Sequence, residues 1–439
     1  IIARSQRNQT QESIEKTIAV LPFQNFSGDP GQDYVCEGLT DEIISHLFKI
    51  KSFDQVRPLQ TVSAYQNSDM STTEIAEALR VRYILQSSYK RMGNEFKITA
   101  RLIEAISDKY IWQQDYDLPY TKISGIPGEI AIQIANGLNA FISEDEQKRI
   151  EKDPTQSHDA YDFYLLGRQH FNDRRRDSDL WQAIEYFQHA IQKDRTFALA
   201  YSGVAAVYHT IANRAIISPS EAYLKAKTYA QQALELNNSL ADAYLTLGLV
   251  RQSFEYKFDE ADKDFKKALE ISPGNPSAHR SYASFLSLMR RNEEAVSYIN
   301  KAIELDPLSP NTETTKYWIL YAAGYKSQTL EMAEQYRDAN PDLPLGYWIT
   351  TAFYIDLEMY DKALSDNLAA IEIMGEDNIS DEIGILGCIY GKMGQMDQAR
   401  LQINKLEELS LRGEYVNPRA YAWYYLGQNN VTKAAEILE

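Results

Sequence analysis

A period of 34 residues in the C-terminal two-thirds of the chain limits its fold more than any other feature. Pro273, Pro307 and Pro341 lie 34 residues apart, and the first two end the related strings ALEISP and AIELDP. The same ending without proline closes earlier segments at Asn237 and Asp194. Such a period predicts a stack of small repeated units, each of which buries its apolar face only against its neighbours.

Within one period, small and large residues have the spacing of two packed helices. Gly248 and Ala261 are small where two antiparallel helices come close, and Phe265 fills the space beside them. Pro273 cannot continue the second helix and therefore ends the unit. This set of positions is similar to the tetratricopeptide repeat.

The resemblance implies an all-helical right-handed solenoid whose concave side is formed by the first helix of each pair. About eight units are expected in 159–439, the last of them ending with the chain. Insertions are expected between the helices of the first two units, at Asp173–Leu180 and Asn213–Ala222.

The N-terminal region has a different pattern, in which apolar β-branched runs alternate with amphipathic segments. It predicts a small α/β domain over residues 17–145, preceded by a polar leader or linker (1–16) and followed by a linker (146–158). Strands are expected at Thr17–Phe23, Phe53–Leu59, Val81–Lys90, Glu95–Glu104 and Lys109–Tyr116, and helices at Val35–Ile50, Glu74–Leu79 and Gly128–Ile142.

This domain resembles the TolB amino-terminal-like domain over about Lys16–Asn139. The resemblance rests on the strings IAVLPF (18–23), NFSGDP (25–30) and EGLTDE (37–42), and on later matches within 75–85, 101–105 and 112–116. One departure is that Gln86-Ser87-Ser88 stands where the family usually has Glu-Gly-Ser, which leaves a local turn or bulge in question.

Charge and cysteine content limit the partners. The formal net charge is −17, from 45 Lys plus Arg against 62 Asp plus Glu. An acidic surface repels phosphates, which argues against direct nucleic-acid binding by this chain. Cys36 and Cys388 fall in different predicted domains, so no disulfide is expected, and the two cysteines do not decide the compartment. No stretch is long and apolar enough for a transmembrane helix.

The sequence predicts no enzyme, no cofactor and no bound metal. The acidic residues Asp29, Asp33, Glu37, Asp41 and Glu42 could pair as acid and base, but a turn and an early helical position explain them more simply. The six histidines lack the spacing of metal ligands.

Four glycines between residues 384 and 394, together with Lys392, resemble a phosphate-binding loop at first sight. A Walker A loop needs four residues between its glycines and a Ser or Thr after the lysine. Here three residues separate Gly387 from Gly391, and Met393 follows Lys392, so the pattern is not met. Close helix packing is the preferred interpretation.

Candidate ligand-binding residues lie on the first helices of the repeats, on the side expected to be concave. We name this set of six the groove residues: Trp318, Trp348, Trp423, Arg280, Arg419 and Gln252. Exposed aromatic rings suit peptide side chains or sugar rings, and arginine can bind a carboxylate bidentately. The alternative is a one-residue error of register, which would return the tryptophans to the core.

Two classes of function follow. An α/β domain of this kind followed by tetratricopeptide repeats resembles the sensory half of bacterial membrane-bound transcriptional regulators and adenylate cyclases. That resemblance implies a periplasmic segment, joined to the membrane through an upstream helix, that binds a protein, peptide or saccharide. The alternative is a cytoplasmic scaffold that assembles protein complexes without signalling. Either protein could form a homodimer, and neither interpretation identifies the ligand.

Overall fold

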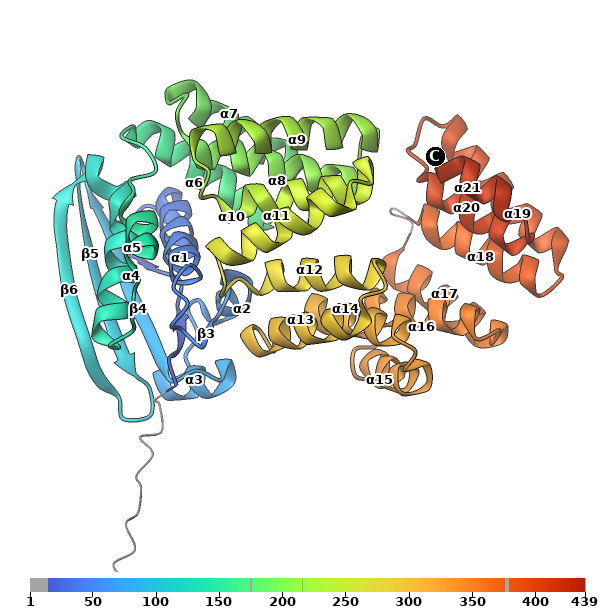
Figure 1. The fold of residues 1–439 in the computed structure, drawn as a ribbon, viewed down its shortest axis with the longest axis horizontal. Helices are drawn as coiled ribbons and strands as arrows, with labels where there is room; N and C mark the ends of the chain where they lie inside the picture. The colour runs from blue at the N-terminus through green and yellow to red at the C-terminus, as the bar shows by residue number, and fades with distance from the viewer. Residues whose placement is uncertain (1–14, 174–175, 215, 376–378, 439) are drawn as a thin grey trace, which may run out of the picture. The chain divides into compact units, whose positions relative to one another are not determined.

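The computed structural model describes residues 15–173, 176–214, 216–375 and 379–438 (Figure 1). The chain divides into two compact units, and the division falls inside the helical array. Unit 1 comprises residues 1–285 and 297–312, and unit 2 comprises residues 286–296 and 313–439. The expected leader lies largely outside the described residues, because residues 1–14 are not among them.

The N-terminal part of unit 1 is a mixed β-sheet. Its strands are β1 (Thr17–Val20), β2 (Gln24–Asn25), β3 (Gln55–Val56), β4 (Tyr83–Met92), β5 (Glu95–Glu104) and β6 (Lys109–Pro119). The order is β3-β1-β4-β5-β6, and β2 pairs with β4. The pairs among β1 to β4 are parallel, whereas β4, β5 and β6 form an antiparallel meander.

Helices cover one face of this sheet (Figure 1). They are α1 (Asp33–Leu47), α2 (Leu59–Val62), α3 (Thr72–Leu79), α4 (Ile126–Gly137) and α5 (Glu144–Glu151). Helix α1 packs against α4 of its own domain and against α6, the first helix of the repeats. The core therefore runs without a break from the sheet through α1 into the helical array.

The remaining described helices form successive antiparallel pairs. In order they are α6 (His158–Asp173), α7 (Asp177–Lys193), α8 (Ala198–Arg214), α9 (Pro219–Leu236), α10 (Ala241–Val250), α11 (Phe258–Ile271), α12 (Pro276–Leu288), α13 (Asn292–Leu305), α14 (Pro310–Ala322), α15 (Lys326–Ala339), α16 (Pro344–Asp356), α17 (Tyr360–Met374), α18 (Ser380–Lys392), α19 (Met396–Leu411), α20 (Pro418–Gly427) and α21 (Val431–Leu438). A π-helical turn, Arg251–Glu255, follows α10. The expected insertion at Asp173–Leu180 lies partly outside the described residues, as does Ala215 of the second one.

Small residues let neighbouring helices approach, as the repeat pattern predicts. A Cβ atom on Gly203 would lie 2.7 Å from the ring of Phe187, so α8 can pack on α7 only without a side chain there. Gly384 in α18 faces the backbone of Ala420 in α20 in the same way. Close helix packing therefore accounts for that member of the C-terminal glycine cluster.

The predicted fold class, a small sheet domain followed by an all-helical array, is confirmed, and no described residue after 160 lies in a strand. The expected strand Phe53–Leu59 is reduced to Gln55–Val56, because Pro58 cannot donate to a ladder and instead stands at the N-cap position of α2. Strand β4 pairs with β5 without a bulge, so Gln86-Ser87-Ser88 disturbs nothing. Helix α5 overlaps the expected linker and begins with a capping box between Ser143 and Glu146.

Arg57 is a buried polar residue that ties the α/β domain to the repeats inside unit 1. Its exposed fraction is 0%. The guanidinium donates to the carbonyl oxygens of Leu79 (2.7 Å) and Arg80 (2.9 Å) at the end of α3. It also donates to the carbonyl oxygen of Leu305 (2.6 Å) at the end of α13. Burial lowers the pKa of Arg57 to about 10, with Asp306 opposing the shift, so the group is still charged at neutral pH.

We expect the substitution Arg57→Met to lower the free energy of unfolding by about 3 kcal/mol or more, because it leaves several buried carbonyl groups without a donor. Urea unfolding followed by circular dichroism measures the change. The matched control is Arg101→Met on β5, where the arginine is exposed. Equal unfolding free energies for the two variants would contradict the role given to Arg57.

Candidate functional site

The groove residues all lie on first helices of the pairs or directly after one. Trp318 is on α14, Trp348 on α16, and Trp423 and Arg419 on α20, all within unit 2. Arg280 on α12 and Gln252 in the π-helical turn after α10 belong to unit 1. The six residues therefore form two sets, one in each unit.

In unit 2, the exposed fractions of Trp318 and Trp348 are 46% and 38%, so neither ring lies in the core. Trp423 is half-buried. Trp318 contacts Phe353 edge-to-face with ring centroids 5.0 Å apart, which holds one edge of the indole while the rest stays open to solvent.

Beside Trp348, two adjacent acidic residues at the start of α18 retain unused hydrogen-bonding capacity. Arg419 donates to Oδ2 of Asp381 at 2.8 Å. Oδ1 of Asp381 and Oε2 of Glu382 are buried and have no hydrogen-bond partner among the described residues. Burial raises the pKa of Glu382, and the carboxylate of Asp381 raises it further, while a hydrogen bond from Trp348 opposes the rise. Arg419 is therefore engaged, and the site offers acceptors rather than a free cation.

In unit 1, Arg280 and Gln252 are half-buried. Burial lowers the pKa of Arg280. Oε1 of Gln252 is buried without a hydrogen-bond partner among the described residues. A ligand that supplied a donor would satisfy this acceptor.

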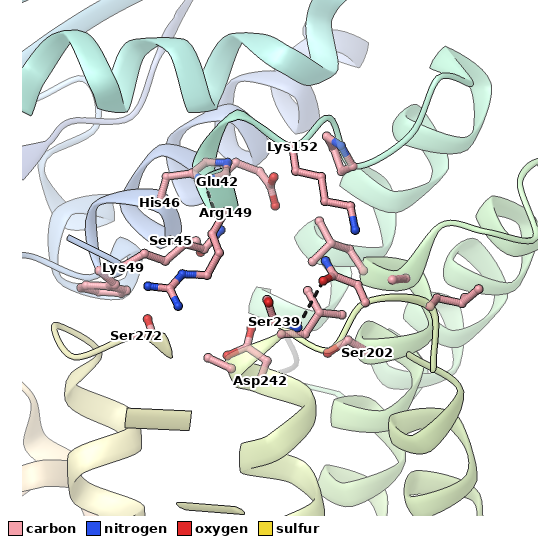
Figure 2. A pocket seen from close by; sticks show the side chains of 18 of the residues that line it. Glu42, Ser45, His46, Lys49, Arg149, Lys152, Ser202, Ser239, Asp242 and Ser272 are labelled. Carbon is pink, nitrogen blue, oxygen red and sulfur yellow. Dashed lines mark hydrogen bonds between the residues drawn. The ribbon is translucent and has the colours of Figure 1, made fainter. Parts of the chain in front are cut away.

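A second location, which the sequence analysis did not identify, is a cavity of about 320 Å³ within unit 1 (Figure 2). We call it the junction pocket. It lies between the C-terminal end of α1, helix α5 with the segment after it, and the first three helix pairs. Its lining includes Glu42, His46, Phe48, Lys49, Arg149, Lys152, Arg168, Leu199, Ser202, Ser239, Leu240, Asp242, Ser272 and Asn275.

Buried charges at the wall of the pocket join α1 to α6. Asp41 and Arg168 form an ion pair, and the hydroxyl of Tyr164 donates to Oε1 of Glu42 at 2.8 Å. Burial raises the pKa of Glu42, although Tyr164, Arg168 and Lys49 all oppose the rise. Burial lowers the pKa of Arg168, but Asp41, Tyr164, Asp242 and Glu42 together outweigh the effect of burial, and the net shift is upward.

A basic pair, His46 and Lys49, lies at the C-terminal end of α1 and just after it. Nζ of Lys49 lies 3.1 Å from Nδ1 of His46. Burial lowers the pKa of His46, and the charge of Lys49 lowers it further, so the ring is neutral at pH 7 and can accept a hydrogen bond from the ammonium group. Burial lowers the pKa of Lys49 as well, with Glu42 and Asp242 opposing and Arg149 reinforcing the shift.

The turn after α11 closes the pocket against α1. The backbone N–H of Gly274 donates to the carbonyl oxygen of Phe48 at 2.9 Å. A Cβ atom on Gly274 would lie 3.2 Å from both the Cα and the carbonyl oxygen of Phe48. The third helix pair is therefore held directly on the backbone of the α/β domain.

Comparison with known proteins identifies the parts of the chain. Residues 14–124 match the family model described as HilA/YgeH-like transcriptional regulator, second domain. Residues 235–275 and 281–307 match the tetratricopeptide repeat. The chain thus has a HilA/YgeH-like second domain followed by tetratricopeptide repeats, which confirms the predicted combination of a regulator-type domain with this repeat.

Two curated relatives are similar to this chain. The putative adenylate cyclase 3 of Rhizobium meliloti is 27% identical over 253 residues, which cover 57% of this chain and 43% of the relative. The transcriptional regulator HilA of Salmonella typhimurium is 25% identical over 311 residues, which cover 70% of this chain and 53% of the relative. The chain spans about half the length of these relatives.

Among solved structures, a tetratricopeptide repeat protein from Parabacteroides merdae is similar, with 12% identity and a TM-score of 0.46. The match covers 62% of this chain and 100% of that one. The two matched domain types of the present chain are not catalytic domains. Among the described residues, no helix has the length and apolar character needed to cross a membrane.

We expect Glu42→Gln to be more stable than the wild type at pH 8 and to lose this advantage as the pH falls toward 4. A carboxyl group whose pKa is raised on folding stabilises the folded state at low pH and loses that contribution as the pH rises through its folded pKa. The amide removes the buried charge and still accepts from Tyr164.

Thermal unfolding at a series of pH values measures the difference, with Glu77→Gln on the exposed side of α3 as control. A Glu42→Gln variant that is less stable than the wild type at pH 8 would contradict the raised pKa.

Proposed function

We propose that the chain is a non-catalytic sensor segment of a bacterial signalling protein, either a transcriptional regulator or an adenylate cyclase, and that its repeats bind a protein or peptide. The observation that carries this proposal is the pair of tryptophans, Trp318 and Trp348, which are exposed on the first helices of two pairs. Large exposed aromatic rings are typical anchors of protein interfaces.

The polar surroundings of Trp348 favour a partner that brings hydrogen-bond donors. Asp381 and Glu382 each keep one buried oxygen without a partner among the described residues. A lysine or arginine side chain, or a backbone N–H of an extended peptide, would satisfy these oxygens while an apolar side chain covers the indole ring. A neutral saccharide could stack on the ring as well, but it would bring no positive charge to an acidic pair in which Arg419 is bound to Asp381, so a peptide is the better fit.

The two relatives support the regulatory part of the proposal, since one is named a transcriptional regulator and the other a putative adenylate cyclase. In this proposal the segment lies in the periplasm and is joined through an upstream membrane helix to an effector domain in the cytoplasm.

The gene sequence upstream of Ile1 tests this arrangement directly. We expect about 20 consecutive apolar residues, preceded by a DNA-binding or cyclase domain. A gene that encodes neither feature would favour the alternative function, a cytoplasmic scaffold.

We expect Trp348→Ala and Trp318→Ala to weaken partner binding by about 2 kcal/mol each, roughly thirtyfold in affinity, because each substitution removes an anchoring ring. The partner is first isolated by cross-linking to the intact protein in its source cells, and its affinity is then measured by calorimetric titration.

Trp181→Ala is the matched control, since this ring is 39% exposed but lies on α7, a second helix. The groove assignment is wrong if all three variants are folded and bind the partner as tightly as the wild type does.

A further inference from the structure

The junction pocket collects cationic side chains in a chain whose net charge is −17. Its lining contains the bases Lys49, Lys148, Arg149, Lys152 and Arg168, against the acids Glu42, Asp153 and Asp242. Three of these bases come from α5 and the residue after it. A concentration of positive charge against the sign of the whole chain indicates a site for an anion.

The bases differ in how far the protein already neutralises them. Arg168 is paired with Asp41. By contrast, the Nε–H group of Arg149 is buried without an acceptor, and no ion pair of Arg149 occurs among the described residues. Nζ of Lys49 lies 3.1 Å from the neutral ring of His46, and the carboxylates of Glu42 and Asp242 act on it without an ion pair among the described residues. Figure 2 shows Arg149 and Lys49 on the same side of the cavity. Both therefore keep donors for a ligand.

The rest of the lining suits a carbon skeleton with a few polar substituents. Leu199, Leu240 and Phe48 supply apolar surface, while Ser202 and Ser239 supply hydroxyl groups. The cavity volume of about 320 Å³ is within the range of small-molecule sites.

We propose that the junction pocket binds a small organic anion, whose carboxylate or phosphate group is held by Arg149 and Lys49 and whose apolar body lies against Leu199 and Leu240. A guanidinium group binds either anion bidentately, and the ammonium group of Lys49 adds a second charge. The proposal concerns a different site from the groove residues and does not depend on the peptide-binding function.

A ligand in this position contacts both parts of unit 1. Lys49 belongs to the α/β domain, whereas Leu199 and Leu240 come from the second and third repeats. Binding of such a ligand favours the folded arrangement of α1 on the repeats by mass action. The contact between the domain and the array would thereby become more stable as the concentration of the ligand rises.

Calorimetric titration of the whole chain at constant ionic strength tests the proposal with four probes. Phenyl phosphate and phenylacetate carry both an anion and an apolar body, inorganic phosphate carries the anion alone, and benzyl alcohol carries the body alone. We expect one saturable site per chain for phenyl phosphate or phenylacetate at millimolar concentration or below. Whichever of the two binds more tightly identifies the ligand as a phosphate or a carboxylate.

Arg149→Gln should weaken that binding at least about tenfold, because it removes a charge-assisted hydrogen bond. Lys152→Gln, at an exposed position on the rim, should also weaken binding of the anionic probe. Lys97→Gln on the distant strand β5 should leave that binding unchanged. Circular dichroism verifies that each variant is folded. The proposal is overturned if neither anionic probe binds, if benzyl alcohol binds as tightly as they do, or if the Arg149 and Lys152 variants bind like the Lys97 variant.

Discussion

The arrangement of unit 1 depends on the hydrogen bonds that the buried, charged guanidinium of Arg57 donates to backbone carbonyl groups. The last carbonyl groups of a helix have no partner within the helix and carry a partial negative charge. Arg57 donates to such groups at the ends of two helices, α3 of the α/β domain and α13 of the fourth pair. One side chain thus satisfies two helix termini that are 226 residues apart in sequence (Leu79 and Leu305).

The second tie between the domain and the array is α1, which is buried or half-buried along residues 34–47. It is packed on the sheet and α4 on one side and on α6 on the other, and Asp41, Glu42 and Thr40 are buried within it. Its polar side chains are consequently matched one by one: Asp41 by Arg168, Glu42 by Tyr164, and Thr40 by the carbonyl oxygen of Cys36. Glu42, Tyr164 and Arg168, which take part in these contacts, also line the junction pocket.

The sequence predicted the parts of this structure that depend on local or periodic patterns. Helix pairs followed from the 34-residue period, and the β4–β5 hairpin from two apolar runs around Gly93. Trp318 and Trp348 were located from the repeat frame and are exposed as that frame requires. Helix α5 was missed although Ser143 and Glu146 form a recognisable capping box. The role of Arg57 and the junction pocket could not be found in this way. Arg57 meets Leu305, and the residues that line the pocket meet one another, only in the folded chain.

Gly274 shows how a neighbouring domain breaks the equivalence of repeats. The corresponding positions one and two periods later are Leu308 and Asp342, whereas a Cβ atom at Gly274 would lie 3.2 Å from the backbone of Phe48, a tight contact. Repeat arrays grow and shrink in evolution by copying whole units, and a copy of a later unit placed at this position would bring a side chain into that contact. Gain or loss of whole repeats is therefore easier to accommodate elsewhere in the array than at the turn that contains Gly274.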